Sequence, residues 1–132
     1  PGVAGVTGIE SYDVIKGLVE AVAPDLVIAV DSLCASKVSR IATSFQLSDA
    51  GITPGSGVKN ARKPLSRDTL GVKVISIGVP MVVYASTILA EGGAGFIGGE
   101  DMVVTPKDVD IMVENCAEII AGAINMFGKK HR

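Results

Sequence analysis

The sequence is poor in the residues that build metal sites and covalent cross-links. It contains one histidine, His131, and two cysteines, Cys34 and Cys116. A lone histidine in a basic tail supplies neither the ligand set of a zinc site nor the base of a serine–histidine triad. Cys116 falls on the apolar face of a helix expected after residue 105, which indicates reduced core thiols in place of a disulfide. We therefore expect no metal and no cofactor.

Strong net charge and long apolar runs are also missing. The formal net charge of the 132 residues is −2, too small to indicate nucleic acid or a membrane surface as a partner. No uninterrupted apolar run approaches the ~18 residues of a membrane span. The chain opens Pro1-Gly2-Val3 without a methionine or a signal pattern, so we expect a trimmed chain or a fragment, with the cytoplasm as its compartment. A 48% apolar and 20% charged composition is typical of a globular protein.

Helix-like and strand-like patterns alternate along the chain. The alternation predicts an α/β fold in a single three-layer domain over 1–132, with a mostly parallel sheet. Thr7 and Glu10 have the spacing of a helix capping box, Pro80 suits the first position of a helix, and Thr105 suits an N-cap. The expected helices cover about 9–22, 33–41, 80–90 and 106–127; the expected strands cover 26–30, 43–47, 73–79 and 102–104; the main expected loops are 49–71 and the Gly-rich 92–99.

One carboxylate follows directly on the first apolar strand. Asp31 ends the run Leu26–Val30, and ligands of open α/β sheets bind beyond the carboxyl ends of strands. A carboxylate in that place is partly desolvated, which raises its pKa and suits acid–base chemistry. The alternative is that Asp31 or Ser32 caps a helix starting near Leu33. The pattern alone leaves both readings open.

The segment after the second expected strand contains further candidates. Asp49 is the nearest carboxylate that could pair with Asp31, although an aspartate in such a turn is usually an Asx-turn residue. Gly55, Ser56 and Gly57 follow in "GITPGSGVKN", which lacks the Gly-Lys-Ser/Thr of a phosphate loop. These small residues either let a backbone approach a bound ligand or form an ordinary surface loop.

Four basic residues follow this loop. Lys59, Arg62, Lys63 and Arg67 form either a solvated loop or a surface that receives an acidic partner. No aromatic residue interleaves with them, which argues against nucleic acid.

Several longer segments together resemble the spore germination protease family. They are "PGVAGVTGIES", "APDLVIAVDSL", "DAGITPGSGVKNARKPLSRDTLGV", "VISIGVPMVV" and "MVVTPKDVDIMVENCAEIIAGAIN". The resemblance covers nearly the whole chain. It skips the Gly-rich stretch at about 91–100, where longer members carry a larger insertion.

The resemblance implies an aspartic-type endopeptidase that degrades small acid-soluble spore proteins in the spore core. It implies a fold similar to the hydrogenase-maturation peptidases, synthesis as a zymogen, and assembly as a homotetramer. Asp31 falls on one of two essential family aspartates, while the other lies in an upstream "TPDALGP"-like segment that this sequence does not contain. The family usually has Asp where this chain has Tyr84. Asp49, Gly55, Ser56 and Gly57 are then candidates for the substrate cleft.

Two rival functions stay open beside this one. A non-catalytic processed fragment or assembly domain of the same family is favoured by the missing second aspartate. A small-ligand or phosphate-binding domain using residues 51–57 is the third reading.

Overall fold

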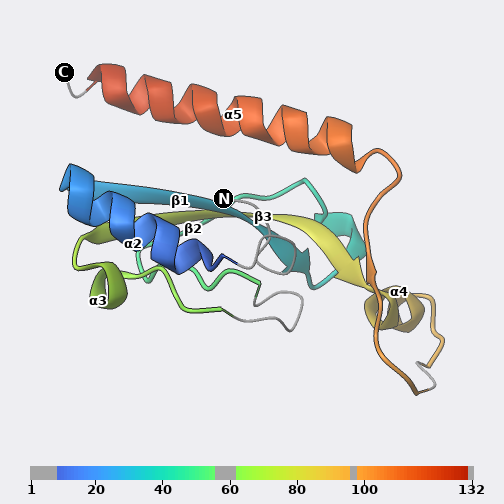
Figure 1. The fold of residues 1–132 in the computed structure, drawn as a ribbon. Coiled ribbons are helices and arrows are strands. Elements are labelled where there is room, and N and C mark those ends of the chain that lie inside the picture. The colour runs from blue at the N-terminus through green and yellow to red at the C-terminus, as the bar shows by residue number, and fades with distance from the viewer. Residues whose placement is uncertain (1–8, 56–61, 96–97, 131–132) are drawn as a thin grey trace. The chain divides into compact units, whose positions relative to one another are not determined.

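The computed structural model describes residues 9–55, 62–95 and 98–130. The chain divides into two compact units. Unit 1 comprises residues 1–32 and 45–78, and unit 2 comprises residues 33–44 and 79–132. The strands β1 and β3 each contribute residues to both units, and the element order is drawn in Figure 1.

Unit 1 begins with the helix α2, Ser11–Val22. Its apolar residues recur at helical spacing, and Tyr12 and Ile15 face the core. Ala23 ends the helix in a left-handed conformation, with its N–H donating to the Val19 carbonyl, and Pro24 follows. The predicted helix is confirmed, but its N-cap is Glu10, so the predicted capping box with Thr7 as the N-cap is wrong.

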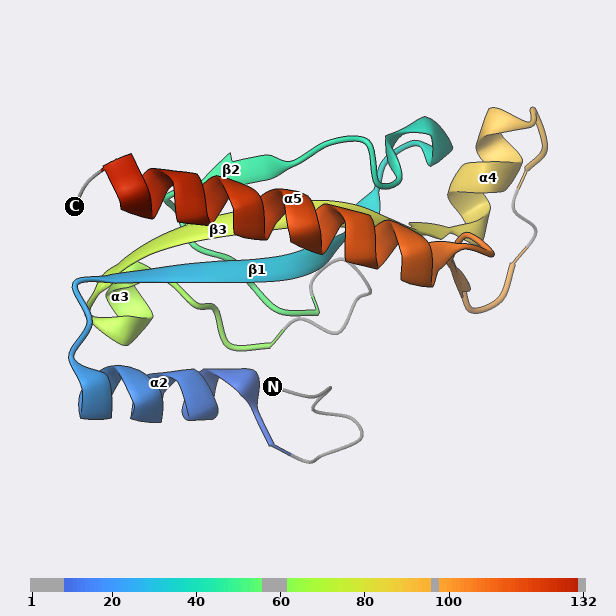
Figure 2. The same ribbon diagram turned by 90° about the horizontal axis from the view of Figure 1, so that it is seen from above.

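The strands form one four-stranded sheet with the order β1-β3-β2, and β4 pairs with β3. Within unit 1, β2 (Gln46–Ser48) pairs antiparallel with β3 (Lys73–Tyr84), so that Leu47 opposes Ile77. The strands β1 (Leu26–Ala35) and β3 run in the same direction (Figure 2). The α/β class is confirmed, but the sheet is mixed and not mostly parallel. The two short strands, β2 and β4, both run antiparallel to β3.

The core of unit 1 lies between the sheet and α2 with the one-turn helix α3, Arg67–Leu70. One buried side chain comes from each of β1, β3, α2, α3 and the loop before α3. The members of this cluster are Tyr12, Ala29, Leu65, Leu70 and Val74. The Tyr12 hydroxyl also donates to the Thr69 carbonyl at 3.0 Å, so the buried phenol is both packed and hydrogen-bonded.

The first strand is longer than its apolar run predicted. β1 continues through Asp31 to Ala35, and only the 3₁₀ turn Val38–Arg40 follows. The predicted helix over 33–41 is therefore wrong, and with it the interpretation of Asp31 or Ser32 as its cap. Asp31 lies inside the strand and not at its carboxyl end.

The third strand is also longer than predicted. β3 passes through Pro80 to Tyr84, so the helix expected from Pro80 starts only at Ala85. Proline is tolerated in a strand where no partner needs its missing N–H. The Pro80 carbonyl still accepts a hydrogen bond from the Ala42 N–H at 2.8 Å. The apolar, partly β-branched run on both sides of Pro80 favours the extended backbone.

Unit 2 contains α4 (Ala85–Glu91), β4 (Val103–Val104) and α5 (Val109–Lys130). The strand expected near 102–104 is confirmed. The long helix is also confirmed, but it begins after the expected Thr105 cap and continues through Gly128. Cys116 and Ile120 are its buried residues, and both cysteines of the chain are free thiols.

By length and composition alone, α5 is the one helix among the described residues that is long and apolar enough to cross a membrane. Glu114 and Glu118 interrupt its apolar sequence, which is why no uninterrupted run of that length occurs. Core helices of soluble proteins and signal sequences meet the same criterion, so this single helix is weak evidence for a membrane span.

Candidate functional site

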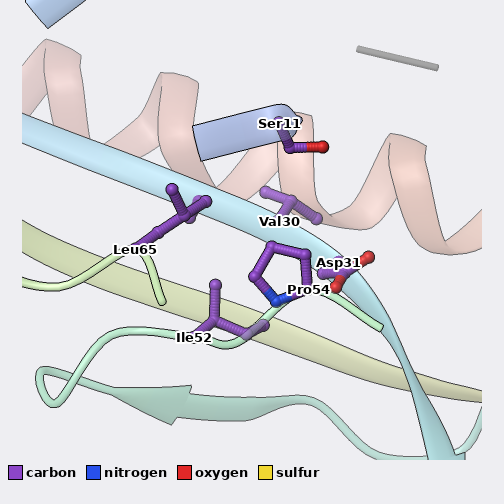
Figure 3. A pocket seen from close by; sticks show the side chains of 7 residues that line it. Ser11, Val30, Asp31, Ile52, Pro54 and Leu65 are labelled. Carbon is purple, nitrogen blue, oxygen red and sulfur yellow. The ribbon is translucent and has the colours of Figure 1, made fainter. Parts of the chain in front are cut away.

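Asp31 lines a small cavity in unit 1. The cavity has a volume of about 210 Å³, below the roughly 300–1,000 Å³ of sites for drug-sized ligands. It is large enough for one side chain or a short stretch of peptide. Three structural elements form its walls: the start of α2, the middle of β1 and the loop between β2 and α3. The lining residues are Ser11, Ala29, Val30, Asp31, Ile52, Pro54 and Leu65, six of which are labelled in Figure 3.

The surroundings of Asp31 favour its protonated form. Partial burial raises the pKa of the Asp31 carboxyl above its ordinary value of 3.8, and the Ser32 backbone N–H acts in the opposite direction. That N–H donates to Asp31 Oδ1 at 2.9 Å, which stabilises the carboxylate. Because desolvation is the larger of the two effects, the net result is a raised pKa of the Asp31 carboxyl. Among the described residues that line the cavity, Asp31 is the only ionisable one.

Backbone hydrogen bonds order the loop between β2 and α3 that forms one wall of the cavity. Ile52 and Leu65 exchange two hydrogen bonds of 2.9 and 2.8 Å, and the Arg62 N–H donates to the Pro54 carbonyl at 3.0 Å. The Arg62 guanidinium also bonds Glu10 at 2.9 Å, which links this loop to the residue before α2. Both side chains of that ion pair are about one-third exposed, so the backbone pairing and not the charge contributes most of the order.

Two small residues position the same loop against the sheet. Gly51 has a φ of +89°, and a Cβ at this position would lie 2.2 Å from the Leu65 carbonyl oxygen. Ser76 on β3 is buried, and its hydroxyl lies 3.2 Å from the Ser48 carbonyl and 3.1 Å from the Gly51 carbonyl. Only glycine fits at position 51. The Ser76 hydroxyl supplies a hydrogen-bond donor to the carbonyl groups of the turn that leads from β2 into the cavity wall.

The other predicted site residues are only partly brought together. Asp49 is exposed in the turn after β2 and is not among the residues that line the cavity. Gly55 follows the lining residue Pro54 in a turn with a φ of +74°. Ser56 and Gly57 lie outside the described residues. The expected loop therefore contributes to the cavity through Pro54, while the pairing of Asp49 with Asp31 stays a prediction.

The basic residues after the loop have separate contacts in the described part of the chain. Arg62 is used in the ion pair with Glu10, and Lys63 Nζ lies 3.7 Å from the centroid of the Tyr12 ring. Arg67 is exposed in α3, and Lys59 lies outside the described residues. Lys63 thus has an aromatic neighbour from a distant part of the sequence, which the local pattern around Lys63 does not reveal.

Most of the lining of the cavity was not identified from the sequence. Ser11, Ile52 and Leu65 fall within the segments that resemble the family, but no local pattern marks them as site residues. The available signal was the position of Pro54 beside Gly55 in a loop that had been singled out. The contact between Glu10 and Arg62 spans 52 residues, so no spacing rule reveals it.

Unit 2 contains a separate group of ionisable side chains, formed by Cys34, Tyr84 and Asp101. Burial raises the pKa of the Cys34 thiol, and the charge of Asp101 raises it further, against a backbone hydrogen bond from Tyr84. The pKa of the Tyr84 phenol is raised as well, first by burial and then by the charges of Cys34 and Asp101. Both groups are thus held in their neutral forms, which makes Cys34 a poor nucleophile. The described residues contain no cluster of three or more His, Cys, Asp or Glu side chains that fits a metal ion.

The fold and the site define a class: an α/β protein with a partly desolvated carboxyl group beside a small cavity, an arrangement suited to acid–base chemistry. The family model described as "Germination protease" matches residues 1–97. Because this match covers more than half of the chain, the protein belongs to the germination protease family.

Individual relatives agree with this assignment. The germination protease of Bacillus subtilis is 60% identical over 91 residues, which cover 69% of this chain and 25% of the relative. The germination protease of Clostridium perfringens is 37% identical over 163 residues, covering 96% of this chain and 50% of the relative. That of Bacillus mycoides is 36% identical over 191 residues, covering 95% and 52%. The chain thus spans between a quarter and about half of the length of these curated relatives.

Proposed function

We propose that this chain forms part of an endopeptidase of the germination protease type, with Asp31 as one member of an aspartate pair. The observation that carries the proposal is the partly desolvated Asp31 carboxyl beside a small cavity. Membership of the germination protease family supports the same reaction class. Small acid-soluble spore proteins are the proposed substrates, and the spore core is the proposed compartment.

Asp31 has the environment that this chemistry requires. Hydrolysis by two carboxyl groups needs one protonated and one ionised member around a water molecule, and environments that separate their pKa values create this state. We assign Asp31 the protonated role, because burial raises the pKa of its carboxyl. In the proposed reaction it protonates the peptide carbonyl oxygen, while an ionised partner takes a proton from the attacking water.

The cavity next to Asp31 supports a role in holding the peptide. Pro54 and Gly55 lie in one turn of its wall, and the proposal extends this contact surface to Ser56, Gly57 and Asp49. Zymogen processing, homotetramer assembly and a fold similar to the hydrogenase-maturation peptidases belong to the same proposal.

Three proteins test the proposal in an assay of small acid-soluble spore protein cleavage. They are this chain, the full-length product of its native gene, and the full-length product with Asp31→Asn. We expect cleavage only by the unmutated full-length protein. Cleavage that survives Asp31→Asn would exclude Asp31 as a catalytic acid.

A second function is favoured by one observation: among the described lining residues of the cavity, no second acid accompanies Asp31. This composition suits a non-catalytic processed fragment or an assembly domain of the same family. The assay above separates the two functions, because the non-catalytic domain gives no cleavage in any of the three proteins once zymogen processing has been confirmed.

A further inference from the structure

The long helix α5 buries only a small part of its apolar surface. Figure 1 shows α5 as one uninterrupted helix, and Cys116 and Ile120 are its buried residues. Every residue from 121 to 130 is exposed. Six large apolar side chains of α5 are between 36% and 74% exposed: Ile111, Val113, Ile119, Ile124, Met126 and Phe127. So much apolar surface on one helix indicates a contact with a further molecule.

Part of this surface has the spacing of a helix–helix contact. Met112, Ile119 and Met126 recur every seven residues, which is close to two helical turns, so the three side chains lie along one line. Met112 is half-buried, whereas Ile119 is 57% and Met126 is 74% exposed. Asn115 and Gly122 complete an alternation of three and four residues, the pattern with which helices pack in pairs. These five residues are called the α5 stripe below.

Gly122 gives an independent indication of a close neighbour. Glycine inside a helix is less stable than alanine. A Cβ at position 122 would meet nothing within 4 Å, so no contact within the described part of the chain requires a glycine there. A second helix whose backbone approaches the α5 stripe closely would require one.

The charges of α5 select the kind of partner. Four exposed acidic residues lie within 108–118, whereas Lys129 and Lys130 end the helix. No basic residue occurs between 109 and 128. Two copies of such a helix place opposite charges together when they run antiparallel, and like charges together when they run parallel. Antiparallel helix dipoles also attract each other.

We propose that the α5 stripe is a contact between two copies of this chain, with the two α5 helices antiparallel about a two-fold axis at Ile119. Met112 then lies opposite Met126 of the second copy, because the two residues are equally far from Ile119 in the sequence. For the same reason Asp108 lies opposite Lys130 of the second copy. The contact is isologous, so each pair of residues occurs twice.

A membrane surface fits the α5 stripe less well. α5 is long enough to meet a lipid bilayer, but helices that lie on membranes usually carry lysine and arginine on their polar face. The first half of α5 carries only acids. The inference rests on the side chains of α5, which lies beyond the family-model match to residues 1–97, and it is independent of the proposed catalysis. A two-fold contact is one of the interfaces that the proposed homotetramer needs.

The molar mass of this chain, measured by sedimentation as a function of concentration, tests the inference. We expect a reversible dimer. Ile119→Glu places two like charges at the two-fold axis, which is strongly unfavourable in an interface, and should raise the dissociation constant by about tenfold or more. Leu18→Glu introduces the same charge at a position of α2 with the same 57% exposure and should leave the constant unchanged. Cooperative thermal unfolding shows that each variant is folded.

Exchange of the end charges tests the antiparallel orientation. Lys130→Asp and Asp108→Lys should each weaken the dimer about fivefold, because two opposite-charge contacts are lost. The double variant restores opposite charges at both ends and should recover most of the wild-type affinity. Both substitutions oppose the helix dipole, so a role in helix stability alone would instead make the double variant the weakest.

Disulfide cross-linking in a Cys34→Ser background gives the register. A mixture of Met112→Cys and Met126→Cys chains should form a cross-linked dimer, because the antiparallel arrangement brings these two positions together. Neither variant alone should cross-link, since its two introduced thiols would be roughly 20 Å apart along the helix axis.

Several results would overturn the inference. A monomer at every concentration, or a dimer that survives Ile119→Glu, would remove the contact, and cross-linking by Met112→Cys alone would establish a parallel pair. Binding to phosphatidylglycerol-containing vesicles that Ile119→Glu abolishes would assign the α5 stripe to lipid. Assembly of the full-length product of the native gene that Ile119→Glu leaves unchanged would assign it to the remaining polypeptide. None of these readouts uses cleavage, so failure here is distinguishable from failure of the proposed function.

Discussion

Asp31 links protonation to stability because burial disfavours its charged form. Its pKa in the folded chain is raised above 3.8, so the folded state binds this proton more tightly than the unfolded chain. The contribution of Asp31 to the free energy of unfolding is therefore greatest below pH 3.8. It falls as the pH rises from 3.8 through the raised folded pKa.

Asp31→Asn should remove this dependence. We expect the variant to be more stable than the wild type at neutral pH, with a flatter profile in the interval above pH 3.8. Urea denaturation between pH 3 and pH 8 measures the difference. Asp25→Asn, which changes an exposed carboxylate, is the control and should keep the wild-type profile. A profile that Asp31→Asn leaves unchanged would contradict the assigned burial effect.

Gly51 is a position where any side chain would meet the backbone of the neighbouring loop. Gly51→Ala places a Cβ 2.2 Å from the Leu65 carbonyl oxygen and 2.8 Å from Ser66 Cα at a positive φ. We expect a loss of stability on the order of 3 kcal/mol from strain and the displaced loop. Chemical denaturation measures it.

Gly71→Ala provides the comparison at residue scale. Gly71 also has a positive φ of +76°, but a Cβ there meets nothing within 4 Å. The variant should lose only about 1–2 kcal/mol from the left-handed backbone. Equal losses in the two variants would show that the contact with Leu65 does not determine the cavity wall.

At the scale of elements, the short helix α4 depends on a cap from outside its own sequence. The Asp101 carboxylate accepts hydrogen bonds from the Ser86 N–H at 3.1 Å and from the Ser86 hydroxyl at 2.5 Å. An acid at a helix N-terminus satisfies free N–H groups and interacts favourably with the helix dipole. Seven residues form too short a helix to persist without such contacts.

Asp101→Ala should therefore loosen α4. We expect a loss of about 1 kcal/mol, seen as roughly fivefold faster amide exchange in residues 85–91. Ser86→Ala should have a smaller effect, because the backbone donor to Asp101 is retained. Glu100→Ala, at the exposed neighbouring position, should leave the exchange unchanged. Comparable acceleration by Glu100→Ala would point to a general charge effect and not to the cap.

At the scale of the whole molecule, stability depends on a small apolar core. Leu70 in unit 1 is 2% exposed, whereas Leu89 in α4 is 39% exposed. Leu70→Ala should cost about 2–5 kcal/mol, a large share of the ~5–15 kcal/mol that stabilises a typical domain. Leu89→Ala should cost about 0.5 kcal/mol. Thermal unfolding measures both, and a similar melting temperature in the two variants would contradict the assigned core.

Local patterns predicted the elements best where the spacing of apolar residues agrees with the residues that end an element. The helix α2 follows from its apolar spacing and from Pro24 after its end. The first part of β1 follows from its unbroken apolar run. The predictions that were wrong concern where elements end: β1 continues past Asp31, and β3 continues past Pro80. Both ends depend on hydrogen-bond partners in neighbouring segments, which local propensity does not contain.

The candidate site shows the same division. Asp31 was identified from its place after an apolar strand, although the strand in fact continues beyond it. The cavity around it was not predicted, because Ser11, Ile52 and Leu65 meet only after folding. The chain's membership of the germination protease family was also read from local segments, and the comparisons confirm it.

The sequence by itself determined the α/β class, the family, the apolar first part of β1 and Asp31 as the candidate acid. These properties depend on residue type and on spacing within a few positions. Tertiary structure decided the mixed sheet, the full lengths of β1 and β3, the desolvation of Asp31 and the cavity beside it. Each of these arises from contacts between residues far apart in the chain, and such contacts exist only once the backbone has brought them together.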